Sequence, residues 1–345
     1  MSGKKTPKAA KPAKELKEVK KIKAEPERRE DIYEILGRAF ESEDDREIEE
    51  LTAQVLAVDP DNPEALLLRA DIIDENEEER LFLLEKARGE LERYFQEKGL
   101  SGEDIFEDEE GLGFVYIAVL QRIAYTLFTL EEDDRSLEVV RELLRYDPED
   151  YALAKTLYYR IYLEREDWTH ILEETMKETN RDLGWAYSRT IATFMLSAGG
   201  REKSAGKKDA EKTGSFVREG SLEKVDKMLW DAVRMAPNAP FYMLGYTPDP
   251  VDDSEEEEDV FHFGILYEGV WVNSRELLNW FSRATILFGL LTGRFGEESG
   301  DMEEILDALG GTTDYEDLTR KLADAPRDDE TVLRVLAEGS YPAAY

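Results

Sequence analysis

Residues 143–168, "LLRYDPEDYALAKTLYYRIYLEREDW", hold the end of one amphipathic pattern, a stop at Asp147-Pro148 and the start of a second pattern. The motif returns as "VLAVDPDNPEALLLRADI" at residues 55–72 and, more loosely, as "LWDAVRMAPNAPFYML" at residues 229–244. Proline lacks the amide hydrogen that a helix interior needs and clashes with the preceding turn, so each stretch predicts a helix end followed by a new helix. Repetition of this pattern indicates an all-α fold built from helical hairpins.

The spacing of the three prolines also favours a repeat. Pro60, Pro148 and Pro237 lie 88 and 89 residues apart, which leaves room for two hairpins in each interval. Aligning Pro148 with the closing proline of the 34-residue tetratricopeptide (TPR) pattern puts the small residues Ala124 and Ser136 where two helices cross. Helices approach closely only where side chains are small, so we expect a TPR-like solenoid, a right-handed superhelix of stacked hairpins. Apolar residues surround the crossing at Leu120, Ile123, Leu127, Val140 and Leu143.

Helical periodicity extends over most of the chain from Asp31 onward. Apolar residues recur there at spacings of three and four, as in amphipathic helices. Strand patterns are almost absent; only "GVWVN" (269–273) has a β-like composition, and it fits a turn equally well. The expected helices cover residues 63–74, 76–98, 113–130, 134–146, 150–164, 167–179, 182–198, 221–236, 262–293, 301–309 and 314–323.

Composition divides the chain into four expected segments. Residues 1–29 form a disordered Lys-rich tail, and residues 30–246 form the TPR-like array, interrupted by a Gly- and Lys-rich loop insertion at 199–220. An acidic linker is expected at 247–260, because "DDSEEEED" has seven acids in eight residues and should be solvated and mobile. A C-terminal helical segment occupies 261–345.

Charge is distributed unevenly along the chain. There are 45 basic and 80 acidic residues, for a net charge of −35. Residues 1–29 contain nine Lys and two Arg against four Glu, a balance of +7, so the rest of the chain carries −42. Such an acidic body repels nucleic acids and anionic membranes and favours basic partners. The same composition also serves solubility alone.

Several classes of site are excluded or weakened by the residues that are missing. The chain has no cysteine, which excludes disulfides, thiolate metal sites and a cysteine nucleophile, and it has two histidines, His170 and His262. No stretch has the roughly 18 uninterrupted apolar residues of a membrane helix. The most apolar segment, residues 280–293, is short and contains Arg283. We therefore expect a cytoplasmic protein that does not bind membranes.

No motif predicts a cofactor or a metal. In "GGREKSAGKKDAEK" the spacing of Gly200 and Gly206 is wrong for a phosphate loop, and Lys208 stands where serine or threonine is needed. The acidic runs lack the EF-hand spacing with its glycine. Paired catalytic carboxylates cannot be selected among 80 candidates. The expectation is a protein that is not an enzyme, without a catalytic residue, cofactor or metal.

One helix face carries residues that often dominate binding. Tyr151, Lys155, Tyr158 and Tyr162 are spaced by four, three and four residues, whereas Leu153, Leu157 and Ile161 occupy a different face and are expected in the core. In repeat solenoids the first helix of each pair lines the concave, partner-binding surface. The alternative is packing of the tyrosine rings between stacked helices. The complete candidate set on the concave face is Tyr125, Tyr151, Lys155, Tyr158, Tyr162, Trp185 and Arg189.

The order of these features resembles a group of bacterial TPR-like proteins that is similar to the suppressor-of-tumorigenicity helical-repeat family. The resemblance covers about residues 45–280 and rests on the phrase "APNAPFYMLGYTPDP", which follows the last repeat and precedes the acidic stretch. The matching residues are Asn238, Pro240, Tyr242, Leu244 and Gly245, while Ala239 stands where the family has proline. The resemblance implies a helical-repeat fold and interaction with proteins rather than a reaction.

These observations predict an adaptor that binds a basic or amphipathic protein segment on an acidic concave face. Two alternatives remain. The first is a ribosome- or RNA-associated factor that binds nucleic acid through residues 1–29 only. The second is an enzyme that uses carboxylates alone, with a divalent cation.

Overall fold

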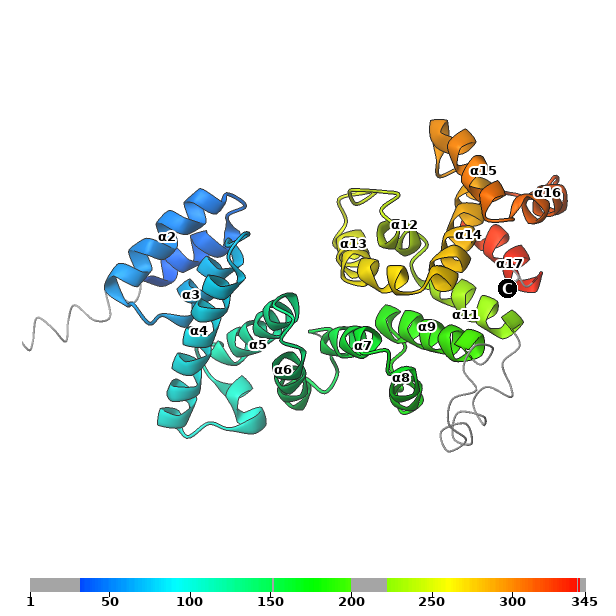
Figure 1. Ribbon diagram of the computed structural model, residues 1–345. Coiled ribbons are helices and arrows are strands. Elements are labelled where there is room, and N and C mark those ends of the chain that lie inside the picture. The colour runs from blue at the N-terminus through cyan, green and yellow to red at the C-terminus, as the bar shows by residue number, and fades with distance from the viewer. Residues whose placement is uncertain (1–31, 151, 200–221, 340, 342–345) are drawn as a thin grey trace, which may run out of the picture. The chain divides into compact units, whose positions relative to one another are not determined.

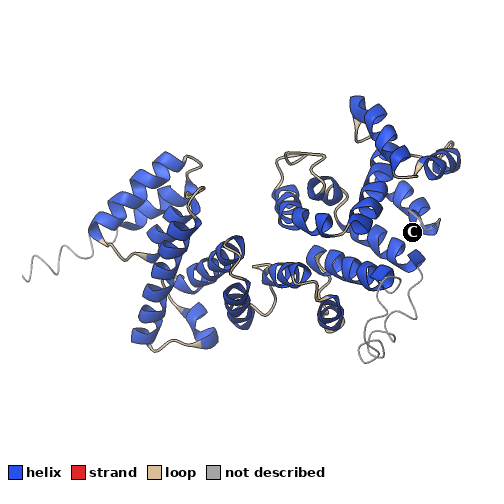
Figure 2. Ribbon diagram, in the orientation of Figure 1, coloured by secondary structure: helices blue, strands red, loops and turns tan. Residues whose placement is uncertain are grey.

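The computed structural model describes residues 32–150, 152–199, 222–339 and 341. All regular structure in these ranges is helical, with no strand (Figures 1 and 2). The all-α class predicted from the sequence is therefore confirmed. The expected tail and loop insertion fall on residues outside those described. The chain divides into two compact units, Met1–Ala152 (unit 1) and Leu153–Tyr345 (unit 2). That boundary falls inside the range 30–246, which the sequence assigns to one array.

Unit 1 begins its described part with a helix at residues 32–41. Each helix packs mainly on its neighbours in the sequence, as expected for hairpins in series. Asn62 caps the third helix, since its side chain accepts a hydrogen bond from the Ala65 amide at 2.9 Å, and Pro63 opens the first turn. The further elements are α2 (Asp45–Val58), α3 (Pro63–Asp71), α4 (Glu77–Lys98), η1 (Gly102–Glu107), α5 (Leu112–Thr129) and α6 (Asp133–Tyr146).

The crossing of α5 and α6 has the close contact that the TPR alignment predicts. The Ser136 hydroxyl is fully buried and donates a hydrogen bond to the Ala124 carbonyl oxygen at 2.7 Å. Only a small side chain at Ser136 allows the two backbones to approach this closely. All five apolar residues predicted around the crossing are buried: Leu120, Ile123, Leu127, Val140 and Leu143.

Helix α5 is also more apolar than the sequence patterns suggested. Of the described helices it alone is long and apolar enough to cross a membrane, by length and composition only, and half of its residues are buried in the protein. Its one charged residue, Arg122, pairs with Asp71 at 2.6 Å. The packing of α5 on α4 and α6 accounts for its apolar composition.

Unit 2 contains the remaining helices, and three tryptophans lie at its centre. Trp230, Trp271 and Trp280 are all almost fully buried in a single apolar core. The elements are α7 (Ala154–Glu164), α8 (Trp168–Thr175), α9 (Leu183–Gly199), α11 (Leu222–Met235), α12 (Ala239–Met243), α13 (Glu255–Tyr267), η2 (Glu268–Asn273), α14 (Arg275–Thr292), η3 (Gly296–Glu298), α15 (Ser299–Ala308), α16 (Thr312–Lys321) and α17 (Asp329–Glu338). Helices α12 and α17 have no counterpart among the helices expected from the sequence.

The start of α7 differs from the prediction. A helix was expected from residue 150, but Asp150 and Leu153 have positive φ values of 62° and 52°. A right-handed helix cannot include such residues, so α7 begins at Ala154. Leu153 is consequently 44% exposed, and its assignment to the core was wrong, whereas Leu157 and Ile161 are buried as expected.

The single long helix expected over residues 262–293 was also wrong. It is interrupted by the 3₁₀ helix η2, after which Ser274 caps α14 by accepting a hydrogen bond from the Leu277 amide at 3.3 Å. The interruption turns Trp271 inward, where its ring stacks on Phe281 with centroids 3.6 Å apart.

The acidic stretch expected as a mobile linker is helical in its second half. Helix α13 starts at Glu255, and Ser254 caps it by accepting a hydrogen bond from the Glu257 amide at 3.2 Å. Glutamates in a first turn are stabilised by the helix dipole. In addition, the Tyr242 hydroxyl and the Asn238 amide, the latter at 3.0 Å, donate hydrogen bonds to the Glu257 carboxylate. The linker boundaries 247–260 therefore do not hold.

Candidate functional site

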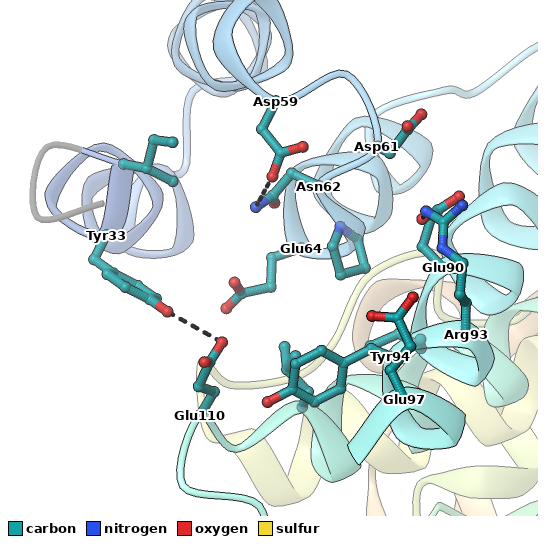
Figure 3. Close-up of a pocket in the computed structure, with 14 residues that line it drawn as sticks. Tyr33, Asp59, Asp61, Asn62, Glu64, Glu90, Arg93, Tyr94, Glu97 and Glu110 are labelled. Atoms are coloured by element: carbon teal, nitrogen blue, oxygen red, sulfur yellow. Dashed lines mark hydrogen bonds and ion pairs between the residues drawn. The ribbon is translucent and has the colours of Figure 1, made fainter. Parts of the chain in front are cut away.

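An acidic pocket of about 340 Å³ lies in unit 1. Its walls come from the start of the helix at residues 32–41, the turn before α3, the second half of α4 and the segment that leads into α5 (Figure 3). Ligand pockets in proteins have roughly 300–1,000 Å³, so this volume suits one or two side chains of a bound segment. The charged residues of its lining are Asp59, Asp61, Glu64, Glu90, Glu97, Glu110 and a single arginine, Arg93.

The repeated Asp-Pro motif builds one wall of this pocket. Asp59 and Pro60 end α2, and the Asn62 cap starts α3 three residues later. The Asn62 amide also donates a hydrogen bond to the Asp59 carboxylate at 3.4 Å. The helix stop thus holds Asp59 beside Glu64, which lies in the first turn of α3. The motif therefore ends a helix and supplies carboxylates at the same time.

Two of the six carboxylates have cationic partners. Arg93 pairs with Glu90, and Lys86 pairs with Asp61 at 3.0 Å. Among the residues that the structure describes, the other four, Asp59, Glu64, Glu97 and Glu110, form no ion pair with a lysine or arginine. The pocket consequently has an excess of negative charge, even though basic residues are available elsewhere on the surface.

Glu97 and Glu110 are exposed, whereas Glu64 is half-buried. Burial, and secondarily the negative charge of Glu110, raises its pKa above the ordinary value of 4.5. Figure 3 shows the Glu64 and Glu110 side chains pointing toward the same space. Because a raised pKa means that the carboxylate lacks stabilising positive charge, a cationic group placed between the two would be held by both.

Two tyrosines flank the acidic groups. The Tyr33 hydroxyl donates a long hydrogen bond of 3.4 Å to Glu110, and the Tyr94 hydroxyl donates one of 2.8 Å to Asp108. Their rings give the pocket an apolar surface beside its carboxylates. The methylene groups of a lysine or arginine pack on such rings while the charged end reaches the carboxylates.

The seven residues predicted for a concave face are distributed over both units. Tyr125 lies in unit 1, where burial, together with the Asp150 carboxylate, raises its pKa to about 12 and keeps the phenol protonated at neutral pH. Tyr151 lies outside the described residues. The other five, Lys155, Tyr158, Tyr162, Trp185 and Arg189, belong to unit 2.

Tyr158 and Tyr162 form an aromatic cluster with His170. The Tyr158 hydroxyl and the His170 Nε2 atom are hydrogen-bonded at 2.7 Å, and the Tyr162 and His170 ring centroids lie 4.0 Å apart. All three side chains are half-buried, and His170 belongs to α8, the partner helix of α7. This arrangement favours the packing alternative for these two tyrosines over an exposed binding face.

Lys155, Trp185 and Arg189 lie around the start of α9. Lys155 pairs with Glu178 at 2.8 Å. The Trp185 amide donates to the Asp182 carboxylate at 2.7 Å, and its indole N–H donates to the Thr175 carbonyl oxygen at 2.8 Å. These two bonds fix the orientation of the half-buried indole. Trp185 and Arg189 therefore remain the candidates best placed for contact with a partner.

Sequence reasoning missed the acidic pocket because it offers no distinctive motif. Its carboxylates Glu64, Glu97 and Glu110 come from three segments, the first turn of α3, the end of α4 and the loop before α5. Nothing separates them from the other acidic residues until the helices are packed. The one available signal was the acidic "DPDNPE" stretch at residues 59–64, which was interpreted only as a helix boundary.

Comparisons of the chain with protein-family models, with curated proteins and with solved structures gave no match. The resemblance to the suppressor-of-tumorigenicity helical-repeat family thus stays a prediction. Across the part of the chain that the structure describes, no group of three or more histidine or acidic side chains is arranged to hold a metal ion.

Proposed function

We propose that the protein is a non-enzymatic cytoplasmic adaptor whose TPR-like hairpins bind a basic segment of a partner protein in the acidic pocket of unit 1. The observation that carries the proposal is the set of four carboxylates, Asp59, Glu64, Glu97 and Glu110, without a described cationic partner. A lysine or arginine is the ordinary group that such a site accepts, and it gains charge-assisted hydrogen bonds there.

The helical framework supports this proposal in two ways. The Ser136–Ala124 contact at 2.7 Å is the close crossing that a TPR-like hairpin requires. Stacked hairpins of this kind form grooves that accept extended or helical peptides. The resemblance to the suppressor-of-tumorigenicity helical-repeat family also implies interaction with proteins. The absence of cysteine fits a reducing compartment such as the cytoplasm.

One alternative function is favoured by a specific observation. Residues 1–29 carry a balance of +7 on a chain that is otherwise strongly acidic. Such a segment binds RNA by releasing counterions, with an affinity that falls steeply as salt rises. The two functions therefore differ in the part of the chain they require and in their response to salt.

Affinity capture from the native lysate distinguishes them. We expect the full chain and a form without residues 1–29 to retain the same protein partner through a wash at moderately high salt. The double substitution Glu64→Gln/Glu110→Gln should lower the recovery of that partner at least tenfold, because each lost charge-assisted contact is worth on the order of 1.5 kcal/mol, or about tenfold in affinity.

The matched control is Glu75→Gln/Glu103→Gln, which removes the same charge from exposed positions of unit 1 outside the pocket. It should leave recovery unchanged. Equal losses in both variants would mean that net charge alone governs binding. Capture dominated by ribosomal proteins and RNA, and abolished by removing residues 1–29, would support the alternative.

Binding of a basic segment should also weaken at mildly acidic pH. The raised pKa of Glu64 means that it becomes neutral at a higher pH than an ordinary glutamate, so the pocket loses one negative charge before the exposed carboxylates do. Recovery of the partner should therefore fall as the wash pH is lowered from 7 toward 4.5, the ordinary value. A Glu64→Gln variant should lack the part of this decrease that occurs at the higher pH values. An identical profile in both proteins would exclude Glu64 as the titrating group.

A further inference from the structure

A second surface, of opposite local charge, lies in unit 2 between α9 and α11. It is a groove of about 160 Å³. Its apolar or small lining residues are Trp185, Ala186, Met228, Ala232 and Met235. The polar and charged lining residues are Arg189, Thr190, Lys224 and Asp231. Met235 is 47% exposed, so its apolar side chain is accessible to a partner. The groove is therefore an apolar strip with charged groups at its edge.

The positive charges at this groove lack acidic partners. Arg181 and Arg189 lie on the Trp185 ring, with their guanidinium carbons 5.2 and 5.1 Å from its centroid. None of the ion pairs between described residues involves Arg181, Arg189 or Lys224. The one acidic residue of the lining, Asp231, pairs instead with Arg234 at 3.0 Å. Within the described lining of the groove, positive charge therefore exceeds negative charge.

The two arginines also repel each other. Burial, and then the positive charge of Arg181, lowers the pKa of Arg189. Two guanidinium groups on one indole ring are held by cation–π attraction despite their mutual repulsion. A carboxylate beside either guanidinium would offset that repulsion and would form bidentate hydrogen bonds with it.

We propose that the α9–α11 groove binds an acidic amphipathic helix of a partner protein. The apolar side chains of that helix would pack on Trp185, Met228 and Met235, since methionines adapt to varied partner shapes. Its acidic residues would lie beside Arg181 and Arg189. Tryptophan and arginine are also the residue types that most often dominate binding energy at protein interfaces.

This inference does not depend on the acidic pocket, because it rests on other residues in the other unit. Together the two surfaces would let one adaptor select two segments of opposite charge. A lysine-rich segment suits the pocket of unit 1, and an acidic amphipathic segment suits the groove of unit 2. The substitutions that test one surface leave the other unaltered, so the failure of either proposal can be distinguished.

The test uses a fluorescein-labelled synthetic helix of about 16 residues, with leucines at helical spacing along one face and glutamates on both flanks. Fluorescence anisotropy measures its affinity for the full chain. We expect saturable binding that weakens at least tenfold in Arg181→Glu/Arg189→Glu and in Met228→Ser/Met235→Ser. The pocket variant Glu64→Gln/Glu110→Gln should bind this peptide as the unaltered chain does.

The control Arg275→Glu/Arg320→Glu makes the same charge change at exposed positions of unit 2 and should alter the affinity less than twofold. An equal loss in this control would overturn the proposal, as would the absence of saturable binding. Equal binding of a peptide with lysine in place of glutamate would also overturn it, since charge complementarity would then play no part.

Two other occupants of the groove give different results. If replacing residues 201–220 with a short Gly-Ser linker raised the affinity tenfold, the chain's own α9–α11 connection would be the occupant. If the chain sedimented as a dimer and Met228→Ser/Met235→Ser made it monomeric, a second copy would be the occupant. Either result would overturn the assignment to a partner's acidic helix.

Discussion

Replacing Trp271 with alanine is expected to lower the free energy of unfolding of unit 2 by about 3–5 kcal/mol. Trp271 is fully buried, stacks on Phe281 with an interplanar angle of 9° and meets the edge of Tyr187 at 6.3 Å. Its indole N–H has no hydrogen-bond partner among the described residues, so the loss would come from packing and from the cavity left behind.

Urea unfolding followed by tryptophan fluorescence measures this effect, because all five tryptophans of the chain belong to unit 2. The neighbouring Val272 belongs to the same 3₁₀ helix but is 68% exposed. Val272→Ala is therefore the control and should change stability by less than about 0.5 kcal/mol. If Trp271→Ala and Val272→Ala lowered the free energy of unfolding by similar amounts, η2 would not anchor Trp271 in the core.

The second large effect is expected at the α5–α6 crossing. Ser136→Leu should destabilise this hairpin by about 2–4 kcal/mol, because the extra carbons must fit between two helices in contact and the hydrogen bond to the Ala124 carbonyl is lost. Ser136→Ala keeps the small volume and should cost only about 1 kcal/mol, the value of the hydrogen bond. The difference in unfolding free energy between Ser136→Leu and Ser136→Ala measures how closely the two helices approach.

Hydrogen–deuterium exchange resolved by peptide locates the change. Amides of α5 and α6 should exchange faster in Ser136→Leu. Glu138→Leu introduces the same side chain on the exposed face of α6, two residues further on, and should leave exchange in the hairpin unaltered. If Ser136→Leu and Ser136→Ala behaved alike, the crossing would not be close, and the TPR-like alignment would lose its main support.

Local sequence rules predicted those parts of the fold that depend on local chemistry. The Asp-Pro stops, the Asn62 cap and the alternation of small and apolar residues at Ser136 each act over a few residues, and the structure agrees at these positions. The helix break at η2 was missed because helical periodicity was given more weight than the turn-like composition of residues 269–273. Periodicity alone does not locate the point where one helix ends and the next begins.

The acidic segment at residues 252–259 failed as a linker for a related reason. Charge density predicts solvation, but Ser254 and the hydrogen bonds from Asn238 and Tyr242 to Glu257 fix the start of α13. Both donors belong to the phrase on which the family resemblance rests. Their role in the structure is to hold this helix.

The acidic character of the candidate site was predictable from the sequence, but the residues that form it were not. The net charge of −35 indicated a basic partner, yet the pocket forms only when Glu64, Glu97 and Glu110 are brought together from three segments. Conversely, Tyr158 and Tyr162 have the expected helical spacing but pack on His170. Spacing identifies a face of a helix and does not tell whether another helix covers it.

The most direct test of the acidic pocket is an affinity measurement with a defined basic peptide. A fluorescein-labelled peptide of about 12 residues, with lysines alternating with leucine and alanine, is titrated against the full chain at neutral pH and physiological salt. We expect saturable binding that weakens roughly 10- to 100-fold in Glu64→Gln/Glu110→Gln and remains unchanged in Glu75→Gln/Glu103→Gln. Equal affinity for all three proteins would contradict the assignment of the pocket as the binding site for a basic segment.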